Sequence, residues 1–515
     1  MSGPMNRRRL LGLGGAFSAL GVGAPFALQL AAAGSASGQS APDYKALVCV
    51  FLYGGNDGHN TVLATDADSW GRYTAARGTG VSPIALMPAG TAKTPVGQTS
   101  ALTGRVAAAD SPEAWGGVLP ITPRTAQAIP AGTSASTRTF ALHPFLGPLQ
   151  SLFDQGRLAV LANVGTLIQP TTKAQYQARS VSLPSSLFSH NDQQSTWQAL
   201  STEGARTGWG GRFGDLLASA NGGNTLFTAV STAGNAVFLS GQSLVQYQLS
   251  TGAQPAVVIS SQQGNSLFGS SLGPSRVRDL ITDTSLANNF AADYAGVVGR
   301  SISAASTINS AFSQPVVTGV AAAPTYSNPL TGATETNSLV LQLQTVARMI
   351  AASSSLGVRR QVFFVSLGGW DTHDNQNSVQ PNLLAKVAHA LSYFDGALAN
   401  IGGMDRRSQV TTFTASDFSR TITTNGDGTD HAWGGHHFIL GGAVRGGDIY
   451  GQYPTLGPDI GGFNNPDGVG GVQIPTTSVD QYGATLGRWF GVSDSDIDVI
   501  FPRLRNFQTR YLGFV

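Results

Sequence analysis

A strand–helix–strand pattern between residues 360 and 415 constrains the fold more than any other feature of the sequence. The apolar, β-branched runs at 360–368 and 409–415 predict buried strands, and the periodicity of residues 379–400 predicts a long helix between them. Two buried strands joined by a long helix are typical of a parallel crossover. The chain is therefore expected to form an open α/β sheet.

Both predicted strands end abruptly in polar and acidic residues. The first runs into GGWDTHDN at 368–375, and the second runs into SDFSR at 416–420. A third apolar run, at 46–60, ends in GGNDGHN. Open α/β sheets bind ligands beyond the carboxyl ends of their strands. If the three strands share one sheet, their polar ends form one site.

Composition excludes several classes of function. The chain has 515 residues, only 11% of them charged, and a net charge of +2. Its arginines form no basic stripe, so nucleic-acid binding is not expected. Cys49 is the single cysteine, which excludes an internal disulfide and thiolate metal clusters. Its apolar surroundings predict a small core residue.

The first forty residues have the order of an export signal. Arg7, Arg8 and Arg9 precede an apolar run, rich in glycine and alanine, that continues to Ala33. The paired arginines resemble the twin-arginine signal. A membrane anchor is the alternative, but the glycines and Pro25 disfavour a spanning helix. Residues 1–40 are expected to direct export to a periplasmic or extracellular location, leaving a mature chain without a membrane span.

Residues 41–515 are expected to form a single α/β domain with two insertions. Residues 66–140 show little periodicity and predict an irregular insertion, and residues 220–335 predict a second one, peripheral and β-rich over 220–275. The remaining α/β elements are predicted as helices at 143–156, 189–199 and 480–490 and strands at 157–165 and 436–440.

Asp371 and His373 are the first candidates for metal ligands. Residues i and i+2 at a strand end point to the same side, so both side chains can face one ion. A carboxylate with an imidazole suits zinc, manganese or iron. The alternative is a polar turn in which Asp371 caps the following structure.

Further candidates follow the later strands. Five of the eight histidines lie between positions 373 and 437, and His431 and His436 are the ligand candidates among them. Asp417 and Arg420 follow the strand at 409–415, where they could bind a metal and an oxyanion respectively. They could equally form a private salt bridge.

Asp57 and Ser189 complete the candidate set. Asp57 stands at the end of the first strand between glycines, in either a ligand site or a tight turn. Ser189 begins the helix at 189–199, where free backbone N–H groups would stabilise a nucleophilic alkoxide. An ordinary helix N-cap is the alternative. The neighbouring His190 is expected to point elsewhere.

Taken in order, several motifs resemble domain-of-unknown-function family 1501. They are the twin-arginine start, FLYGGNDGHNTV, LHPFLGPLQSLFDQGRLAVLANVG, SHNDQQ, GWGGR, GGWDTH, TFTASDFSR, TDHAWGGHHFILGG and PTTSVDQYGATLGRWFG. That family is grouped with the alkaline phosphatase and sulfatase superfamily. The resemblance implies an alkaline phosphatase/sulfatase-like α/β fold, in which helices flank a largely parallel mixed sheet with loop-rich and β-rich insertions. It also implies one or two divalent ions, with zinc, manganese, magnesium and calcium as candidates.

The resemblance also suggests a role for each candidate residue. Asp57 is similar to the first-strand metal carboxylate, and Ser189 to the superfamily nucleophile. Asp371 and His373 resemble the ligand pair of one metal. Asp417 resembles the carboxylate ligand of the other metal, with His431 or His436 as the late histidine.

The sequence departs from the superfamily pattern in three places. One residue separates Asp371 from His373 where the phosphatases usually have three, and Phe418 stands where they have histidine. A Cys-x-Pro-x-Arg motif is absent, which disfavours a formylglycine sulfatase. Two functions follow as expectations. The first is an exported metal-dependent hydrolase of phosphate or sulfate esters on small molecules or glycans. The second is a non-catalytic exported module that binds a partner protein or a surface glycan.

Overall fold

The computed structural model describes residues 43–515 except 81, 131–132, 134–135, 224, 253–255, 257–265 and 459–462. The predicted export signal at 1–40 lies outside the described residues. Within the described part of the chain, no helix is both long enough and apolar enough to cross a membrane.

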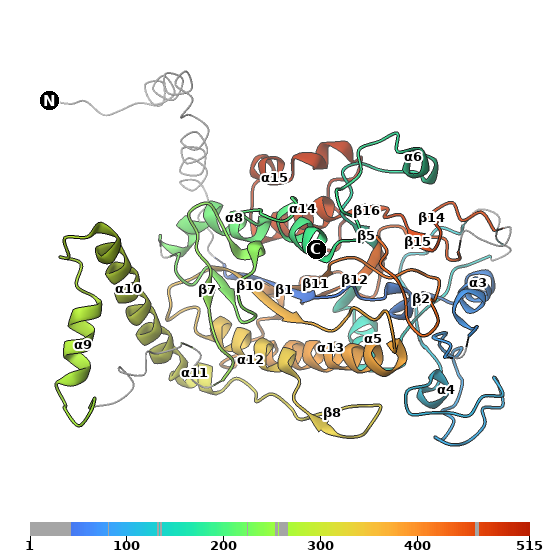
Figure 1. Ribbon diagram of the computed structural model, residues 1–515, viewed down its shortest axis with the longest axis horizontal. Helices are drawn as coiled ribbons and strands as arrows, with labels where there is room; N and C mark the ends of the chain where they lie inside the picture. The colour runs from blue at the N-terminus through green and yellow to red at the C-terminus, as the bar shows by residue number, and fades with distance from the viewer. Residues whose placement is uncertain are drawn as a thin grey trace.

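A mixed sheet of nine strands forms the centre of the molecule (Figure 1). β1 lies in its middle, parallel to both neighbours, and only β12 runs antiparallel to the strands beside it. In order, the strands are β13 (Ile449–Tyr450), β5 (Leu158–Gly165), β12 (Gly435–Leu440), β11 (Val410–Ser416), β1 (Lys45–Leu52), β10 (Arg360–Leu367), β6 (Ala229–Ser231) and β7 (Tyr247–Gln248), while β16 (Thr477–Ser478) pairs with β5. The expected α/β class with a largely parallel mixed sheet is confirmed.

The three central strands end at the same level. Leu52 at the end of β1 pairs with Leu367 of β10 on one side and with Ser416 of β11 on the other. The helix that connects β10 to β11 is α13 (Gln376–Leu398). The polar segments that follow the three strands therefore start side by side at one edge of the sheet.

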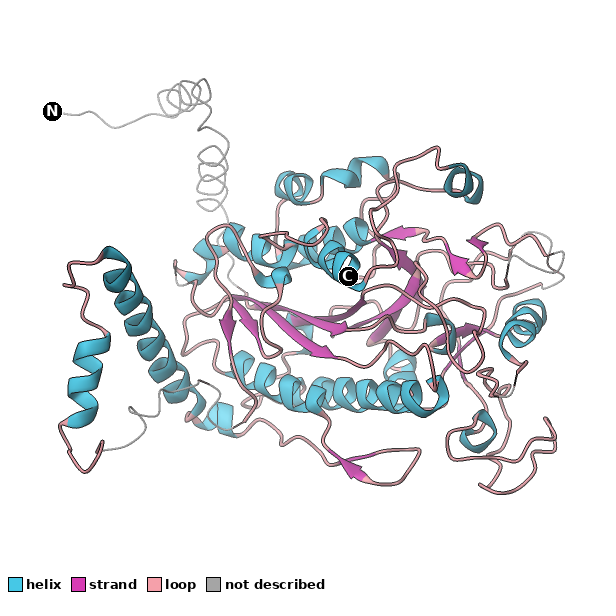
Figure 2. Cartoon of the chain, in the orientation of Figure 1, coloured by secondary structure: helices cyan, strands magenta, loops and turns pink. Residues whose placement is uncertain are grey.

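Helices cover both faces of the sheet (Figure 2). Val48 and Val50 of β1 belong to the core on one face, and Leu47 and Cys49 to the core on the other. This alternation follows from the two-residue period of a strand. The first face packs against α5 (Gly147–Asp154), α12 (Ser338–Ala351) and α13, and the second against α7 (His190–Ala199), α8 (Trp209–Leu216), α14 (Val479–Phe490) and α15 (Asp494–Ile500).

The two predicted insertions contain more regular structure than expected. β6 in the second one pairs with β10 and so belongs to the central sheet rather than to a peripheral unit. The first one contains helices and part of a small sheet with order β2–β4–β3. Most of these elements have only two to four residues, which is too short for periodicity to reveal. They are α3 (Ala67–Arg77), α4 (Pro112–Trp115), β2 (Val62–Ala64), β3 (Leu119–Ile121) and β4 (Phe140–Leu142).

The remaining described elements lie around this body. They are α6 (Lys173–Ala178), α9 (Gly273–Ile281), α10 (Asn289–Phe312), α11 (Pro315–Thr318), β8 (Tyr326–Ser327), β9 (Thr334–Glu335), β14 (Gly468–Val469) and β15 (Val472–Gln473). Short 3-10 helices occur at Gly58–Asn60, Ala218–Asn221, Val237–Leu239, Arg407–Gln409 and Pro502–Asn506.

The pH dependence of folding stability is expected to depend on Asp480, near the start of α14. Its side chain is buried, and Oδ1 has no hydrogen-bond partner among the described residues. Burial raises the pKa of Asp480 to about 6. Because this folded pKa exceeds the unfolded value of about 3.9, the folded chain binds the proton more tightly, and stability falls as pH rises through this window.

Comparison of wild type with Asp480→Asn checks this expectation. Urea unfolding is measured at several pH values between about pH 4 and pH 8. The free energy of unfolding of the variant should rise relative to that of wild type as the pH rises, by at most roughly 3 kcal/mol. A difference that stays constant over the whole pH range would contradict it.

Candidate metal centre

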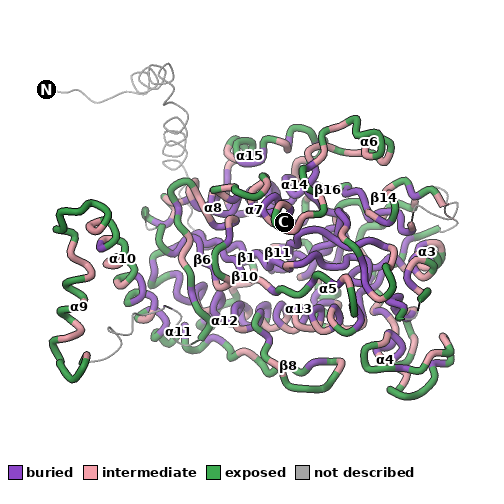
Figure 3. The backbone as a smooth tube through the Cα atoms, viewed as in Figure 1, coloured by how far each residue is buried: buried purple, intermediate pink, exposed green. Residues whose placement is uncertain are grey.

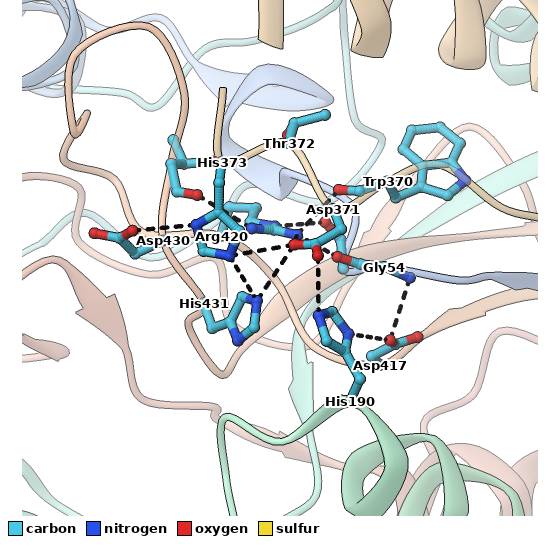
Figure 4. Close-up of polar contacts among 12 residues, drawn as sticks. Gly54, His190, Trp370, Asp371, Thr372, His373, Asp417, Arg420, Asp430 and His431 are labelled. Atoms are coloured by element: carbon cyan, nitrogen blue, oxygen red, sulfur yellow. Dashed lines mark hydrogen bonds and ion pairs between the residues drawn. The ribbon is translucent and has the colours of Figure 1, made fainter. Parts of the chain in front are cut away.

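Four segments bring polar side chains together at the carboxyl edge of the sheet (Figure 4). The segment after β10 supplies Asp371 and the segment after β11 supplies Asp417. The connection towards β12 supplies His431, and the first residue of α7 supplies His190. The expected convergence of the strand ends is therefore observed for β10 and β11, and a helix outside the sheet joins them.

Asp371 lies at the centre of the cluster. His190 Nε2 is 3.4 Å from Asp371 Oδ2, and His431 Nε2 is 3.3 Å from Asp371 Oδ1. One potential ligand atom from each of these three residues lies within 4.8 Å of the other two. Partial burial would raise the pKa of Asp371, but its hydrogen bond with Arg420 and the charge of that residue lower it to about 2. The carboxylate is therefore ionised at neutral pH.

The outer contacts of the two imidazoles fix which nitrogen carries the proton. His190 Nδ1 lies 2.7 Å from Asp417 Oδ2, and His431 Nδ1 lies 2.8 Å from the carbonyl oxygen of Phe188. A carboxylate and a carbonyl only accept, so both Nδ1 atoms must donate. In the neutral rings, both Nε2 lone pairs then face the Asp371 carboxylate. A proton or a cation between these nitrogens and the carboxylate stabilises such an arrangement.

The spacing of these atoms suits a metal ion. Zinc binds imidazole nitrogen and carboxylate oxygen at about 2.0–2.2 Å, which in tetrahedral geometry puts neighbouring ligand atoms roughly 3.3 Å apart. The two imidazole–carboxylate separations of 3.3 and 3.4 Å match that edge. His190 Nε2 is also buried and has no hydrogen-bond partner among the residues that the structure describes. The donor set and the orphaned nitrogen therefore fit a divalent cation.

Asp417 supports the cluster from behind His190. Its Oδ2 atom accepts from His190, from Gln194 Nε2 at 2.8 Å and from the backbone N–H of Gly54 at 3.2 Å. Its side chain is fully buried, and no arginine or lysine among the described residues pairs with it. A buried carboxylate needs a compensating positive charge. The contact with Asp417 accordingly raises the pKa of His190, despite the opposing effect of burial.

Arg420 holds the loops around the cluster. Its side chain is fully buried. It donates to the carbonyl oxygens of Gly54, Gly55, Thr429 and Trp370 and to Asp371 Oδ1. These contacts place Arg420 behind Asp371, so the salt bridge of Arg420 is with Asp371 and not with Asp417, the partner that the sequence suggested.

Gly54 allows the two loops to approach each other. It has a φ of +118°, and a Cβ at this position would lie 2.4 Å from the backbone nitrogen of Asp371. Any other residue would displace the loop that carries Asp371.

His373 lies at the outer side of the cluster. Its Nε2 atom is 2.9 Å from His431 Nε2 and 3.3 Å from Asp371 Oδ1, and its Nδ1 atom is 3.3 Å from Asp430 Oδ1. Both side chains of this outer pair are exposed, His373 by 40% and Asp430 by 62%. His373 can therefore add a fourth ligand or contact a molecule arriving from solvent.

The structure does not bring Asp57 into the cluster. Its oxygens accept from Arg77 at 2.5 and 3.0 Å, from Gln376 at 2.7 Å and from the backbone N–H of His59 at 3.0 Å. Both partners of the Asp57–Arg77 pair are fully buried. The carboxylate is thus occupied by a structural ion pair instead of the expected first-strand metal.

His436 also lies apart from the cluster. Its Nδ1 accepts from the backbone N–H of Asn163 at 3.1 Å, and its ring stacks on Tyr453 with a centroid distance of 4.6 Å. Burial lowers its pKa well below the ordinary value, so the ring is neutral. Of the two late histidines considered, His431 is the one that contacts Asp371.

Ser189 and His190 both differ from the main sequence-based expectation for them. Ser189 is the N-cap of α7, and its Oγ accepts from the backbone N–H of Asp192 at 3.5 Å. His190, expected to point elsewhere, contacts both Asp417 and Asp371. Side chains lean towards the N-terminus of a helix, so a first-turn residue projects beyond the helix start. That rule, with Gln194 four residues later on the same face, was the available signal.

The comparisons with known proteins assign a family without an activity. The family model described as a protein of unknown function (DUF1501) matches residues 44–501. A search of curated proteins finds no match.

Proposed function

The chain belongs to the DUF1501 family, and we propose that it is an exported metal-dependent hydrolase of phosphate or sulfate esters with a single metal centre. His190, His431 and the Asp371 carboxylate are its ligands, and His373 can add a fourth. The observation that carries the proposal is the convergence of two Nε2 lone pairs on one carboxylate, with both rings fixed by their outer hydrogen bonds.

The donor set narrows the choice of metal. Magnesium and calcium prefer oxygen ligands, whereas mixed imidazole and carboxylate sites suit zinc, iron and manganese. Asp57 and His436 are engaged elsewhere. The proposal therefore has one transition-metal ion rather than the two ions that the superfamily resemblance implied.

A bound divalent ion would supply Lewis acidity to polarise an ester oxygen and to lower the pKa of a water molecule. The protein side chains contribute orientation. Asp417 holds the His190 ring, the Phe188 carbonyl holds the His431 ring, and Arg420 fixes the Asp371 carboxylate. Phe418 packs against both imidazoles, with ring centroids 4.8 Å from His190 and 4.4 Å from His431. This apolar contact limits water on that side of the cluster.

The surroundings also offer places for a nucleophile and for the body of a substrate. Ser189 precedes His190 directly and stands at a helix N-terminus, which favours negative charge. A surface cavity of about 600 Å³ shares Phe188 with the cluster. Apolar and polar side chains line it, including Tyr176, Arg179, Leu183 and Leu187. In this proposal Ser189 Oγ, having lost its proton, would attack the phosphorus or sulfur atom and displace the alcohol of the ester, and water would then hydrolyse the serine ester to release phosphate or sulfate. The cavity takes the non-reacting part of the substrate.

Elemental analysis and an ester assay together test the proposal. The purified protein should bind about one transition-metal ion per chain and hydrolyse p-nitrophenyl phosphate or p-nitrophenyl sulfate. A chelator should abolish hydrolysis, and the metal should restore it. Absence of bound metal after incubation with zinc, manganese and iron would overturn the metal centre. Bound metal without hydrolysis of any ester would instead favour the non-catalytic binding module.

Asp417→Asn is expected to lower the metal affinity roughly 10- to 100-fold, the usual effect of changing a residue that orients a metal-binding histidine. The charge next to His190 Nδ1 is lost while the shape of the side chain is kept. Isothermal titration calorimetry with zinc measures the effect. Asp430→Asn is the matched control and should bind zinc almost as wild type does, because the Asp430 side chain contacts none of His190, His431 and Asp371. Its partners among the described residues are the exposed His373 and the Asn425 side chain. Equal losses in both variants would contradict the specific role of Asp417.

A further inference from the structure

A helical arm, residues 266–303, stands away from the α/β body (Figure 1). It contains α9 and the first part of α10. The second part of α10 packs into the main core through Ala304, Ala305, Ile308 and Phe312. In Figure 3 the arm is largely exposed, whereas α10 becomes buried where it reaches the body. One helix thus anchors the arm and extends it into solvent.

The exposed part of α10 carries an apolar stripe. Phe290 is 88% exposed, Tyr294 70% and Val297 48%. Positions i, i+4 and i+7 lie on one face of a helix, so these side chains form a continuous stripe. The arm also exposes Phe268, Leu272, Leu280 and Leu286. A stripe of this kind on an otherwise polar surface marks an interaction site.

Two charges of opposite sign flank the stripe. Asp293 and Arg300 are exposed, lie seven residues apart and therefore fall on the same side of α10. No ion pair is found for either of them within the described part of the chain, whereas Arg276 and Asp279 on α9 pair with each other. If a second α10 lies antiparallel on the stripe, centred between positions 296 and 297, each Asp293 faces the Arg300 of the partner. The stripe is thus self-complementary in charge about a two-fold axis.

The exposed area is sufficient for a stable contact. An aromatic side chain buries about 150–250 Å², so Phe290 and Tyr294 together offer roughly 300–500 Å², to which Val297 adds. A standard interface buries about 800 Å² per partner, of which roughly 60% is apolar. The α10 stripe therefore offers most of the apolar share of an interface of this size.

We propose that the chain forms a two-fold symmetric dimer in which the α10 stripes of two copies pair antiparallel. Val297 lies beside the two-fold axis, Tyr294 and then Phe290 follow outwards along each helix, and the Asp293–Arg300 pairs at the flank set the orientation. A two-fold contact uses the same patch on both copies, which is the property that this stripe has. Because the arm stands away from the body, the two α/β bodies lie apart, and each keeps its own metal centre.

Sedimentation equilibrium of the full chain over a concentration series tests the dimer. Wild type should be dimeric, and Phe290→Glu should raise the dissociation constant roughly 30-fold or more, as expected for an aromatic residue that the contact buries. Asp293→Arg alone and Arg300→Asp alone should also weaken the dimer, because each places like charges opposite one another. The double variant Asp293→Arg/Arg300→Asp should restore it.

Circular dichroism and thermal unfolding of each variant confirm that it is folded. Restoration in the double variant supports antiparallel pairing. A wild type that stays monomeric at every concentration overturns the dimer. A dimer whose dissociation constant is unchanged in all four variants overturns this interface. A monomer that co-migrates with phospholipid vesicles in a flotation gradient identifies a membrane surface as the occupant instead.

Discussion

The variant His190→Gln should lose bound divalent metal, with an affinity loss exceeding the roughly 100-fold limit seen for residues that only orient a ligand. The physical reason is that Gln removes one of two imidazole lone pairs that face Asp371. It also leaves the buried Asp417 carboxylate without its imidazole partner. Zinc titration calorimetry and elemental analysis of the dialysed protein measure the loss.

Ser189→Ala is the neighbouring control. It removes the N-cap of α7, at an expected cost of about 1 kcal/mol in unfolding free energy, but it leaves every ligand in place. Metal content should therefore stay at the wild-type level, whereas ester hydrolysis should disappear if Ser189 is the nucleophile. Retention of full metal binding in His190→Gln would falsify the ligand assignment.

Asp57→Asn should lower the free energy of unfolding by roughly 3–5 kcal/mol, because it leaves the buried Arg77 guanidinium without its charged partner. Burial would raise the pKa of Asp57, but Arg77 outweighs it and the pKa is lowered. The stabilisation from ionised Asp57 is thus present above its unfolded pKa and disappears as the pH falls through the folded value. Urea unfolding at neutral pH measures the loss.

The double variant Asp57→Asn/Arg77→Met separates an ion pair from a metal ligand. Removing both charges should recover part of the stability, since an apolar replacement of both partners costs less than one unpaired buried charge. Both variants should bind zinc as wild type does, provided that they are folded. A loss of zinc binding in the folded double variant would return Asp57 to the metal centre.

The residues of the cluster could be predicted from the sequence where a local pattern, such as an apolar run that ends in polar residues, shows where a strand ends. Apolar runs that end in GGWDTHDN and SDFSR indicated strand ends, and parallel neighbours in a sheet bring such ends together. Asp371 and His373 were predicted in this way, and His431 was predicted from the clustering of histidines. The elements around them were also close to expectation: β10 ends at Leu367, one residue before the predicted end, and α14 ends at Phe490, as predicted.

Two predicted ligands, Asp57 and His436, lie outside the cluster because their positions depend on contacts with distant parts of the chain. Asp57 looks like a ligand from its own strand end, but Arg77 reaches it from α3, inside a segment with little periodicity. His436 lies on a strand whose side chains alternate between faces, and the pairing of β12 with β5 sets which face it occupies. Neither the Asp57–Arg77 ion pair nor the pairing of β12 with β5 can be predicted from the spacing of residues in the sequence.

The sequence by itself determined the central strands, the polar segments at their ends and the carboxylate around which the cluster forms. These features follow from side-chain periodicity and chain direction, which act over a few residues. Only the tertiary structure decided that His190 completes the cluster, that Asp417 and Arg420 support it from behind, and that Asp57 pairs with Arg77. These choices depend on packing between segments far apart in the chain, where burial forces each charge to find a partner.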